Sequence, residues 1–321
     1  MGKDRICVVG SLNVDLVAYV HPKAAAAGYT TGGRFESNAG GKSLNAALSL
    51  ASAGIGVDIV GRVGDDLFGQ QLLQKLDQSG LSRAFVAIDP IAHTGIGHVR
   101  VSASGEYDTV VIPGANGRLS SADVDRYLAT AESPTWTILN LEFPLATVVH
   151  AASAFAAKGS NVVLNLSPLD GTETEFPAAD VTVLNAREAC IVLKRPEGML
   201  GDIDRALDEL RRVIGGAIVV TLGEDGAAAI DDAGICRVEG HPVDVVNAVG
   251  AGDSFLAVLV LALSSGESLP DVLAAANLGG MLACQRAESN LAPSDIESIE
   301  RQLGIRLRPS PEMSSPTGGT A

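Results

Sequence analysis

A short glycine-rich segment with one aspartate, Gly250-Ala251-Gly252-Asp253, has the residue types for chemistry on a phosphate. An apolar run at residues 256–263 follows it and predicts a buried helix. Small residues let a phosphate approach the backbone, and the first-turn amides of a helix can bind phosphoryl oxygens. Asp253 could then take the proton from a hydroxyl that accepts a phosphoryl group. The same residues would equally suit a helix cap after a tight turn.

A second glycine-rich segment, Gly40-Gly41-Lys42-Ser43, is similar to the end of the phosphate-binding loop of nucleoside triphosphatases, Gly-x-x-x-x-Gly-Lys-Ser. The similarity stops upstream, because Glu36 stands where that loop has its first glycine. A carboxylate at that point would also repel a phosphate at close range. The sequence therefore does not predict a nucleoside triphosphatase loop here.

Two further segments could serve a nucleotide. Asn185 and Glu188 lie three residues apart after an apolar run, so they could share a helical face and position water on a magnesium ion. Alternatively, they form a capping box at the start of a helix. Thr221, Gly223 and Gly226 belong to a loop that could contact a nucleotide or could simply be a glycine-rich turn.

Short β-rich runs alternate with helical patterns along most of the chain. Strands are predicted at residues 6–9, 58–63, 137–141, 161–166, 181–184 and 217–221. Helices are predicted at residues 43–52, 66–78, 145–158 and 203–213. This alternation predicts an α/β fold with a doubly wound, mostly parallel sheet that has helices on both faces. Ligands of such sheets bind at the carboxyl ends of the strands.

Residues 14–37 and 93–112 break that rhythm, because they show strand-like alternation and turn residues without a helical pattern. We expect them to form a small β-flap, in which a hairpin turns at Ser104-Gly105-Glu106. A flap outside a doubly wound sheet is typical of a lid that closes over a ligand.

Composition limits the classes of partner. Of the 321 residues, 46% are hydrophobic, and 23 basic against 38 acidic side chains give a formal charge of −15, which repels nucleic acid and anionic membranes. The longest apolar stretch is about half of the roughly 20 residues that span a bilayer. The four cysteines are scattered, and the expected compartment is a reducing cytoplasm. Residues 1–305 are predicted to form a single domain, and residues 306–321, rich in Pro, Ser, Thr and Gly, a disordered tail.

Taken in order, the motifs of this chain are similar to those of the ribokinase-like sugar kinases, the PfkB family, over residues 6–293. The first motifs are Gly10-Ser11-Leu12-Asn13-Val14-Asp15, Gly40-Gly41-Lys42-Ser43-Leu44-Asn45 and Val63-Gly64-Asp65-Asp66-Leu67-Phe68-Gly69. The later ones are Pro113-Gly114-Ala115-Asn116, Leu141-Glu142-Phe143-Pro144-Leu145, Leu164-Asn165-Leu166-Ser167-Pro168, Asn185-x-x-Glu188, Thr221-Leu222-Gly223 and Gly250-Ala251-Gly252-Asp253. Each motif is weak alone, and their order carries the resemblance.

The resemblance implies an ATP-dependent kinase that transfers the γ-phosphoryl group to the primary hydroxyl of a furanose sugar. It makes Asp253 the catalytic base, with Gly250, Ala251 and Gly252 around the phosphoryl group. Besides Asp253, the residues that would bind sugar hydroxyls are Asn13, Asp15, Gly41, Lys42, Asn45 and Glu142. The residues that would serve ATP are Thr221, Gly223 and Gly226, with Asn185 and Glu188 acting on Mg²⁺ through water. Within the family the motifs are most similar to those of ribokinases, which implies D-ribose as acceptor and D-ribose 5-phosphate as product.

The chain departs from the family pattern just before Asp253. The usual Asp-Thr-x-Gly-Ala-Gly-Asp reads Asn247-Ala248-Val249-Gly250-Ala251-Gly252-Asp253 here. In ribokinases the first aspartate helps to bind an activating monovalent cation. Asn247 keeps an oxygen ligand but loses the charge, so a K⁺ site here would be weakened.

Two alternatives stay open at this point. The acceptor could be another furanose or a nucleoside, such as fructose or adenosine, with the same mechanism. A sugar- or nucleotide-binding regulator without catalysis is the second alternative, and the intact Asp253 argues against it. The edges of the flap could also pair in a homodimer.

Overall fold

Nine strands form the central sheet of the computed structural model, which describes residues 5–21, 32–102, 107–173 and 175–308. Their order is β13-β12-β11-β10-β9-β8-β1-β4-β5. All neighbours from β11 to β5 run parallel, and β12 and β13 are added antiparallel at one edge. The bounds are β1 Arg5–Val9, β4 Gly56–Gly64, β5 Val86–Asp89, β8 Trp136–Leu139, β9 Asn161–Asn165, β10 Val181–Asn185, β11 Ala217–Thr221, β12 Ala227–Asp231 and β13 Gly234–Val238. The predicted mostly parallel sheet is confirmed.

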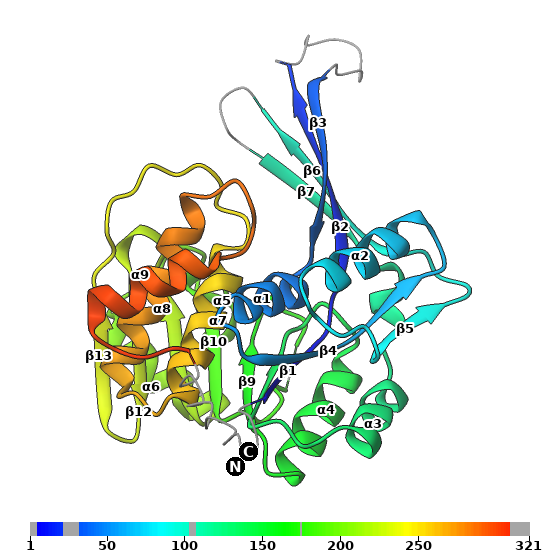
Figure 1. Ribbon diagram of the computed structural model, residues 1–321. Coiled ribbons are helices and arrows are strands. Elements are labelled where there is room, and N and C mark those ends of the chain that lie inside the picture. Colours follow the sequence, from blue (N-terminus) through cyan, green and yellow to red (C-terminus); the bar gives the residue numbers. More distant parts are fainter. Residues whose placement is uncertain (1–4, 22–31, 103–106, 174, 309–321) are drawn as a thin grey trace, which may run out of the picture.

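Helices cover both faces of this sheet (Figure 1). One face carries α1 Lys42–Ala51, α2 Leu67–Gln78, α7 Ala251–Ser264, α8 Leu269–Cys284 and α9 Pro293–Leu303. The other face carries α3 Ser121–Thr130, α4 Leu145–Ala157, α5 Ala186–Val192 and α6 Ile203–Ile214. Two short 3₁₀ helices are η1 Gly114–Arg118 and η2 Gly223–Asp225. Within the described parts of the chain, no helix has the length and apolarity needed to cross a membrane.

Strand β1 explains why the sheet needs two layers of helices. Ile6 and Val8 belong to the hydrophobic cluster on the α7 face, whereas Cys7 and Val9 belong to the cluster on the α4 face. Successive residues of a strand point to opposite faces, so the apolar run from Ile6 to Val9 must be covered on both sides.

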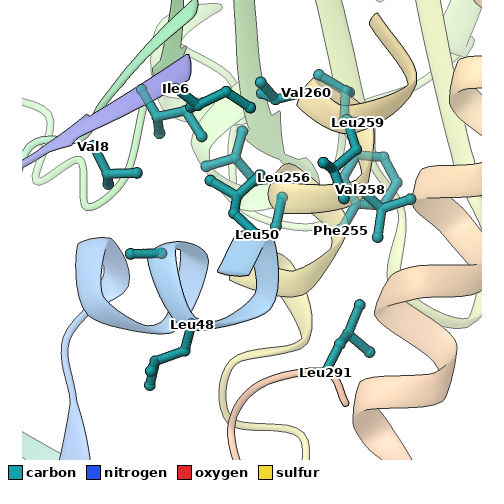
Figure 2. Close-up of a cluster of buried hydrophobic side chains, with 14 of the residues drawn as sticks. Ile6, Val8, Leu48, Leu50, Phe255, Leu256, Val258, Leu259, Val260 and Leu291 are labelled. Atoms are coloured by element: carbon teal, nitrogen blue, oxygen red, sulfur yellow. The ribbon is translucent and has the colours of Figure 1, made fainter. Parts of the chain in front are cut away.

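Helix α7 lies in the core, and residues 253–262 are all buried. Figure 2 shows Leu256 of α7 in the same hydrophobic cluster as Leu50 of α1. Burying one such leucine contributes roughly 1.5–3 kcal/mol, so this contact holds the two helices together firmly. A buried polar contact of 3.3 Å between the hydroxyls of Ser49 and Ser254 also joins them. The first turns of α1 and α7 are thereby held side by side.

The predicted β-flap is a separate four-stranded sheet in the order β3-β2-β6-β7. The bounds are β2 Asn13–Val20, β3 Gly32–Gly40, β6 Gly95–Val101 and β7 Tyr107–Ile112. It extends away from the central sheet and its helices (Figure 1). The predicted hairpin is present, with Val99 opposite Thr109, while its predicted turn lies outside the described residues.

Several predicted boundaries differ from the observed ones by one to three residues, and two of these differences have a clear physical reason. The strand expected at 137–141 ends at Leu139, because the Asn140 side chain turns to accept a hydrogen bond from the backbone of Glu142. Residues 306–308, which were expected to belong to a disordered tail, are part of the folded protein, since Leu307 is buried and Arg308 pairs with Glu300. Composition alone could not show that one leucine of this segment has a place in the core. Residues 309–321 lie outside the described residues.

Candidate active site

Gly250 places Asp253 in the first turn of α7. It is the residue before the helix and has a φ of 81°, in the left-handed region that favours glycine. A Cβ at this position would also fall on the backbone carbonyl of Ser289. Gly250 therefore makes the expected tight turn, and Ala251 and Gly252 in the first turn of α7 line a pocket.

Asp253 is 6% exposed and accepts a 2.9 Å hydrogen bond from Nδ2 of Asn45 in α1. Burial raises the pKa of Asp253, while Lys42 and the Asn45 hydrogen bond oppose the rise. A carboxylate with a raised pKa is a stronger base than an ordinary aspartate. The amide orientation leaves the buried Oδ1 of Asn45 without a protein partner among the described residues, so it is available to accept from a ligand hydroxyl.

Glu142 lies across the site from Asp253. Its Oε2 accepts from the Ser11 hydroxyl and, at 3.2 Å, from the backbone N–H of Lys42. Asn140 accepts from the backbone N–H of Glu142 and donates to Ser43 Oγ at 2.7 Å. This network ties the end of β8 to the first turn of α1, and it holds a second carboxylate near the base.

Asp15 points between two flap glycines. A Cβ on either Gly40 or Gly97 would collide with its carboxylate. Burial, together with the nearby charges of Glu142 and Asp253, raises the pKa of Asp15 to about 6. Three carboxylates thus converge here, which is costly unless a ligand with several hydroxyls donates to them.

Sugar affinity is expected to fall as the pH drops below about 6, because protonated Asp15 loses acceptor capacity. The kcat/KM for the sugar, measured from pH 5 to 8 at saturating ATP, should show this acid limb. The KM for ATP is the internal control and should not follow the same curve. A flat sugar profile down to pH 5 would contradict the assignment of Asp15.

The remaining predicted sugar ligands lie in the same place. Asn13 is 4% exposed at the start of β2, two residues before Asp15 and on the same face of the strand. Gly41 has a φ of 95° and approaches the backbone of Ser11 and Asn13 so closely that a side chain would not fit. The structure therefore brings together all seven residues expected to bind the sugar.

A pocket of about 490 Å³ adjoins this cluster at the start of α7. The predicted residues among its walls are Thr221, Gly223, Gly226, Ala251 and Gly252. Because a helix N-terminus opens into it, the pocket suits a ligand with phosphate groups.

Asn185 and Glu188 form the capping box that the sequence left as an alternative. The Glu188 backbone donates to Asn185 Oδ1 and the Asn185 backbone donates to Glu188 Oε2, both at 2.9 Å. Asn185 is the register partner of Thr221, so the cap lies at the same sheet edge as the pocket. In the described residues no three His, Cys, Asp or Glu side chains are grouped to hold a metal directly.

The side chain of Asn247 does not fit a cation site. Its Nδ2 donates to the carbonyl of Ala287 at 3.1 Å, and its Oδ1 accepts from the backbone of Val249 at 3.0 Å. The amide thus links the segment before α7 to the segment after α8 by hydrogen bonds. An N–H group pointing at a carbonyl takes the place that a cation would need.

Several polar residues of the site were missed by sequence reasoning. Ser11, Asn116 and Asn140 hold the predicted ligands, but Ser11 and Asn116 showed no signal beyond their place in the motifs, and Asn140 lies just outside one. His241 and Asn277 are missed walls of the pocket, and nothing in their local sequence marks them.

The chain is similar in sequence to known sugar kinases. The chain is 28% identical to a ribokinase of Bacillus subtilis over 282 residues, which cover 87% of this chain and 92% of that protein. It is 30% identical to a deoxyribokinase of Salmonella typhi over 253 residues, covering 78% and 83% of the two chains.

Solved structures share the fold. A ribokinase of Arabidopsis thaliana complexed with ribose and ATP matches with a TM-score of 0.81 at 23% identity, covering 95% of this chain and all of that one. A ribokinase of Thermotoga maritima matches with a TM-score of 0.80 at 20% identity, covering 92% and 99%. The model of the "pfkB family carbohydrate kinase" matches residues 3–296, and the chain therefore belongs to this family.

Proposed function

We propose that this ATP-dependent sugar kinase transfers the γ-phosphoryl group of ATP to the primary hydroxyl of D-ribose, giving D-ribose 5-phosphate. The observation that carries the proposal is the cluster of Asn13, Asp15, Asn45 and Glu142 beside a buried Asp253, at the N-terminus of a helix that opens into a pocket. The ribokinases among the relatives support ribose as the acceptor.

In this mechanism the sugar lies at the root of the flap with its primary hydroxyl toward Asp253. Asp253 takes the hydroxyl proton as the oxygen attacks the γ-phosphorus, the bond from this phosphorus to the β,γ-bridging oxygen breaks, and ADP leaves. The amides of Ala251 and Gly252 stabilise charge on the phosphoryl oxygens, where one well-placed donor is worth about 2.7–4 kcal/mol. Because phosphoryl transfer passes through a loose transition state, positioning and these donors contribute more than proton removal.

ATP would occupy the pocket beside Thr221, Gly223 and Gly226, which have no large side chains. Asn185 and Glu188 would hold Mg²⁺ through water, and the ion would neutralise phosphate charge when bound. Their capping box already fixes both side chains, so the edge is preorganised for this task.

The test is an ADP-release assay with ATP over pentoses, hexoses and nucleosides, with 2-deoxyribose included because a deoxyribokinase is among the relatives. We expect ribose to give the highest kcat/KM. A higher kcat/KM with fructose or adenosine would mean that this compound is the acceptor, phosphorylated by the same mechanism. Binding of sugar and ATP without ADP release would overturn the proposal.

Potassium is expected to have little effect on the wild-type enzyme. The Asn247 amide already joins the segment before α7 to Ala287 by a hydrogen bond, so no cation is needed to bridge them. In Asn247→Asp, two oxygens would face each other at Ala287. This variant should lose about 10-fold in kcat without K⁺, as for a lost hydrogen bond with an unpaired group, and recover part of it with K⁺. The kcat of the wild type and of Asn247→Asp, each measured in KCl and in tetramethylammonium chloride, would test both expectations.

Asn161→Asp is the matched control, because Asn161 also donates to a backbone carbonyl, that of Thr135, but at the amino end of β9. It should stay insensitive to K⁺. Strong stimulation of the wild-type enzyme by K⁺ would show that a cation binds despite Asn247.

The flap is proposed to act as the lid over the sugar, since Asp15 and Asn13 lie at its root. Its edge strands β3 and β7 carry exposed apolar side chains, Phe35 on one and Val110, Val111 and Ile112 on the other. Such edges suit pairing in a homodimer.

The four cysteines are free thiols, which suits the proposed cytoplasmic location.

A further inference from the structure

Asn116 is a buried asparagine in η1, between the flap and α3, and it contacts the start of β2. Its Oδ1 accepts from the backbone N–H of Leu12 at 3.0 Å, and its Nδ2 donates to the carbonyl of the same residue at 3.2 Å. A flipped amide would face donor to donor and acceptor to acceptor. The backbone of Leu12 therefore allows only one orientation of the Asn116 side chain.

That orientation decides the orientation of a second amide. The other N–H of Asn116 Nδ2 donates to Oδ1 of Asn13 at 2.7 Å, in a buried contact. Asn13 Oδ1 thus faces Asn116, and Asn13 Nδ2, with its two N–H donors, faces away from it. Gly95 of β6 packs on this pair so closely that a Cβ would fall on both amides. Only a glycine fits at this position while the two amides stay in contact.

We infer that Asn116 is a positioning residue that makes Asn13 a hydrogen-bond donor in the sugar site. This inference rests on the proposed function, because it takes Asn13 to bind a sugar hydroxyl. Three polar groups of the site then have fixed roles. Asn13 donates, whereas the orphaned Asn45 Oδ1 and the carboxylate of Asp15 accept.

The fixed roles have a consequence for the acceptor. Asn13 and Asp15 lie on the same face of β2, so they meet neighbouring parts of one ligand. The ligand group at Asn13 must accept a hydrogen bond, and the group at Asp15 must donate one. A hydroxyl satisfies both requirements, whereas a protonated amine has no lone pair to offer Asn13. The site therefore selects a neutral hydroxylated sugar over an amino sugar at this position.

Asn116→Asp is the direct test, because a carboxylate cannot donate to Asn13 and frees that amide to turn its oxygen to the sugar. The KM for the sugar should rise about 10- to 100-fold, as when a hydrogen-bonding site loses its match. The kcat at saturating sugar and the KM for ATP should stay near the wild-type values. Asn161→Asp is the control for the same change outside the site.

A double-mutant cycle separates positioning from a purely structural role. In an Asn13→Ala background the Asn116→Asp change should have no further effect on the sugar KM, because the amide that it orients is gone. An equal rise in both backgrounds would overturn the inference.

Should Asn116→Asp not fold, Asn13→Asp tests the same point, since it replaces the donor by an acceptor and leaves Asn116 intact. It should lose sugar affinity at least as strongly as Asn13→Ala, and a wild-type sugar KM in Asn13→Asp would overturn the inference. If the wild-type enzyme phosphorylates no sugar, the proposed function fails instead. These results are therefore distinguishable.

Discussion

Replacing Asp253 with asparagine is expected to lower kcat about 10²- to 10⁴-fold, the range that a positioned general base contributes. Asparagine has the same shape and can still accept from Asn45, so the two helices should keep their places. The loss should therefore appear in the chemical step and not in ATP binding. Steady-state kinetics with ribose and calorimetric titration with ATP would measure the two separately.

The surface variant Asp77→Asn is a fair comparison for Asp253→Asn. Asp77 is half exposed and pairs only weakly with Arg83, at 3.5 Å. The kcat and KM values of Asp77→Asn should therefore equal those of the wild type. An Asp253→Asn enzyme with more than about a tenth of the wild-type kcat would mean that positioning and phosphoryl-oxygen stabilisation suffice without a base.

Asp15→Asn is expected to make the protein more stable and nearly unable to bind sugar. The pKa of this carboxyl is raised from 3.8 to about 6 by folding, so ionisation above pH 6 disfavours the folded state. At 1.36 kcal/mol per pH unit, removing the charge should raise the free energy of unfolding by up to about 3 kcal/mol at neutral pH. The kcat/KM for ribose should fall by about 10²-fold or more, since a hydroxyl loses a charged acceptor.

Urea unfolding at two pH values gives the sign of the stability effect. The raised pKa destabilises the folded protein fully above pH 6, and the effect disappears below 3.8, where both states are protonated. The advantage of Asp15→Asn should therefore be large at pH 7.5 and absent near pH 3.5. A variant less stable than the wild type at pH 7.5 would show that Asp15 is satisfied within the protein itself.

The main sheet could be predicted because its strands carry their own signal. The residues of β10, Val181–Asn185, are apolar and β-branched for most of their length, and only a doubly covered sheet accommodates such a run. Strand β5, Val86–Asp89, is short and ends in an aspartate, and β12 begins with three alanines, so neither stands out. The positions of β5 and β12 in the sheet are determined by the strands that pair with them.

The site could be predicted where one short motif carries both turn and function, as at Gly250 and Asp253. It could not be predicted where a residue acts through a distant one. Asn116 orients Asn13 across 103 positions, and no local pattern encodes that contact. The residues of α8 that line the pocket, such as Asn277, likewise lie in a helix whose sequence reports only its packing.

The hydrogen bond between Asn45 and Asp253 spans 208 positions of the chain, and the one between Ser49 and Leu291 spans 242. Contacts of such separation form late in folding, because the entropy of closing a long loop is lost before the contact is gained. During refolding, the helical circular dichroism signal should therefore recover before turnover does. A chain still lacking its last helices has the sugar ligands of β2 and α1 but no base to act on what they bind. Turnover therefore reports that the chain has been synthesised and folded at least through α7.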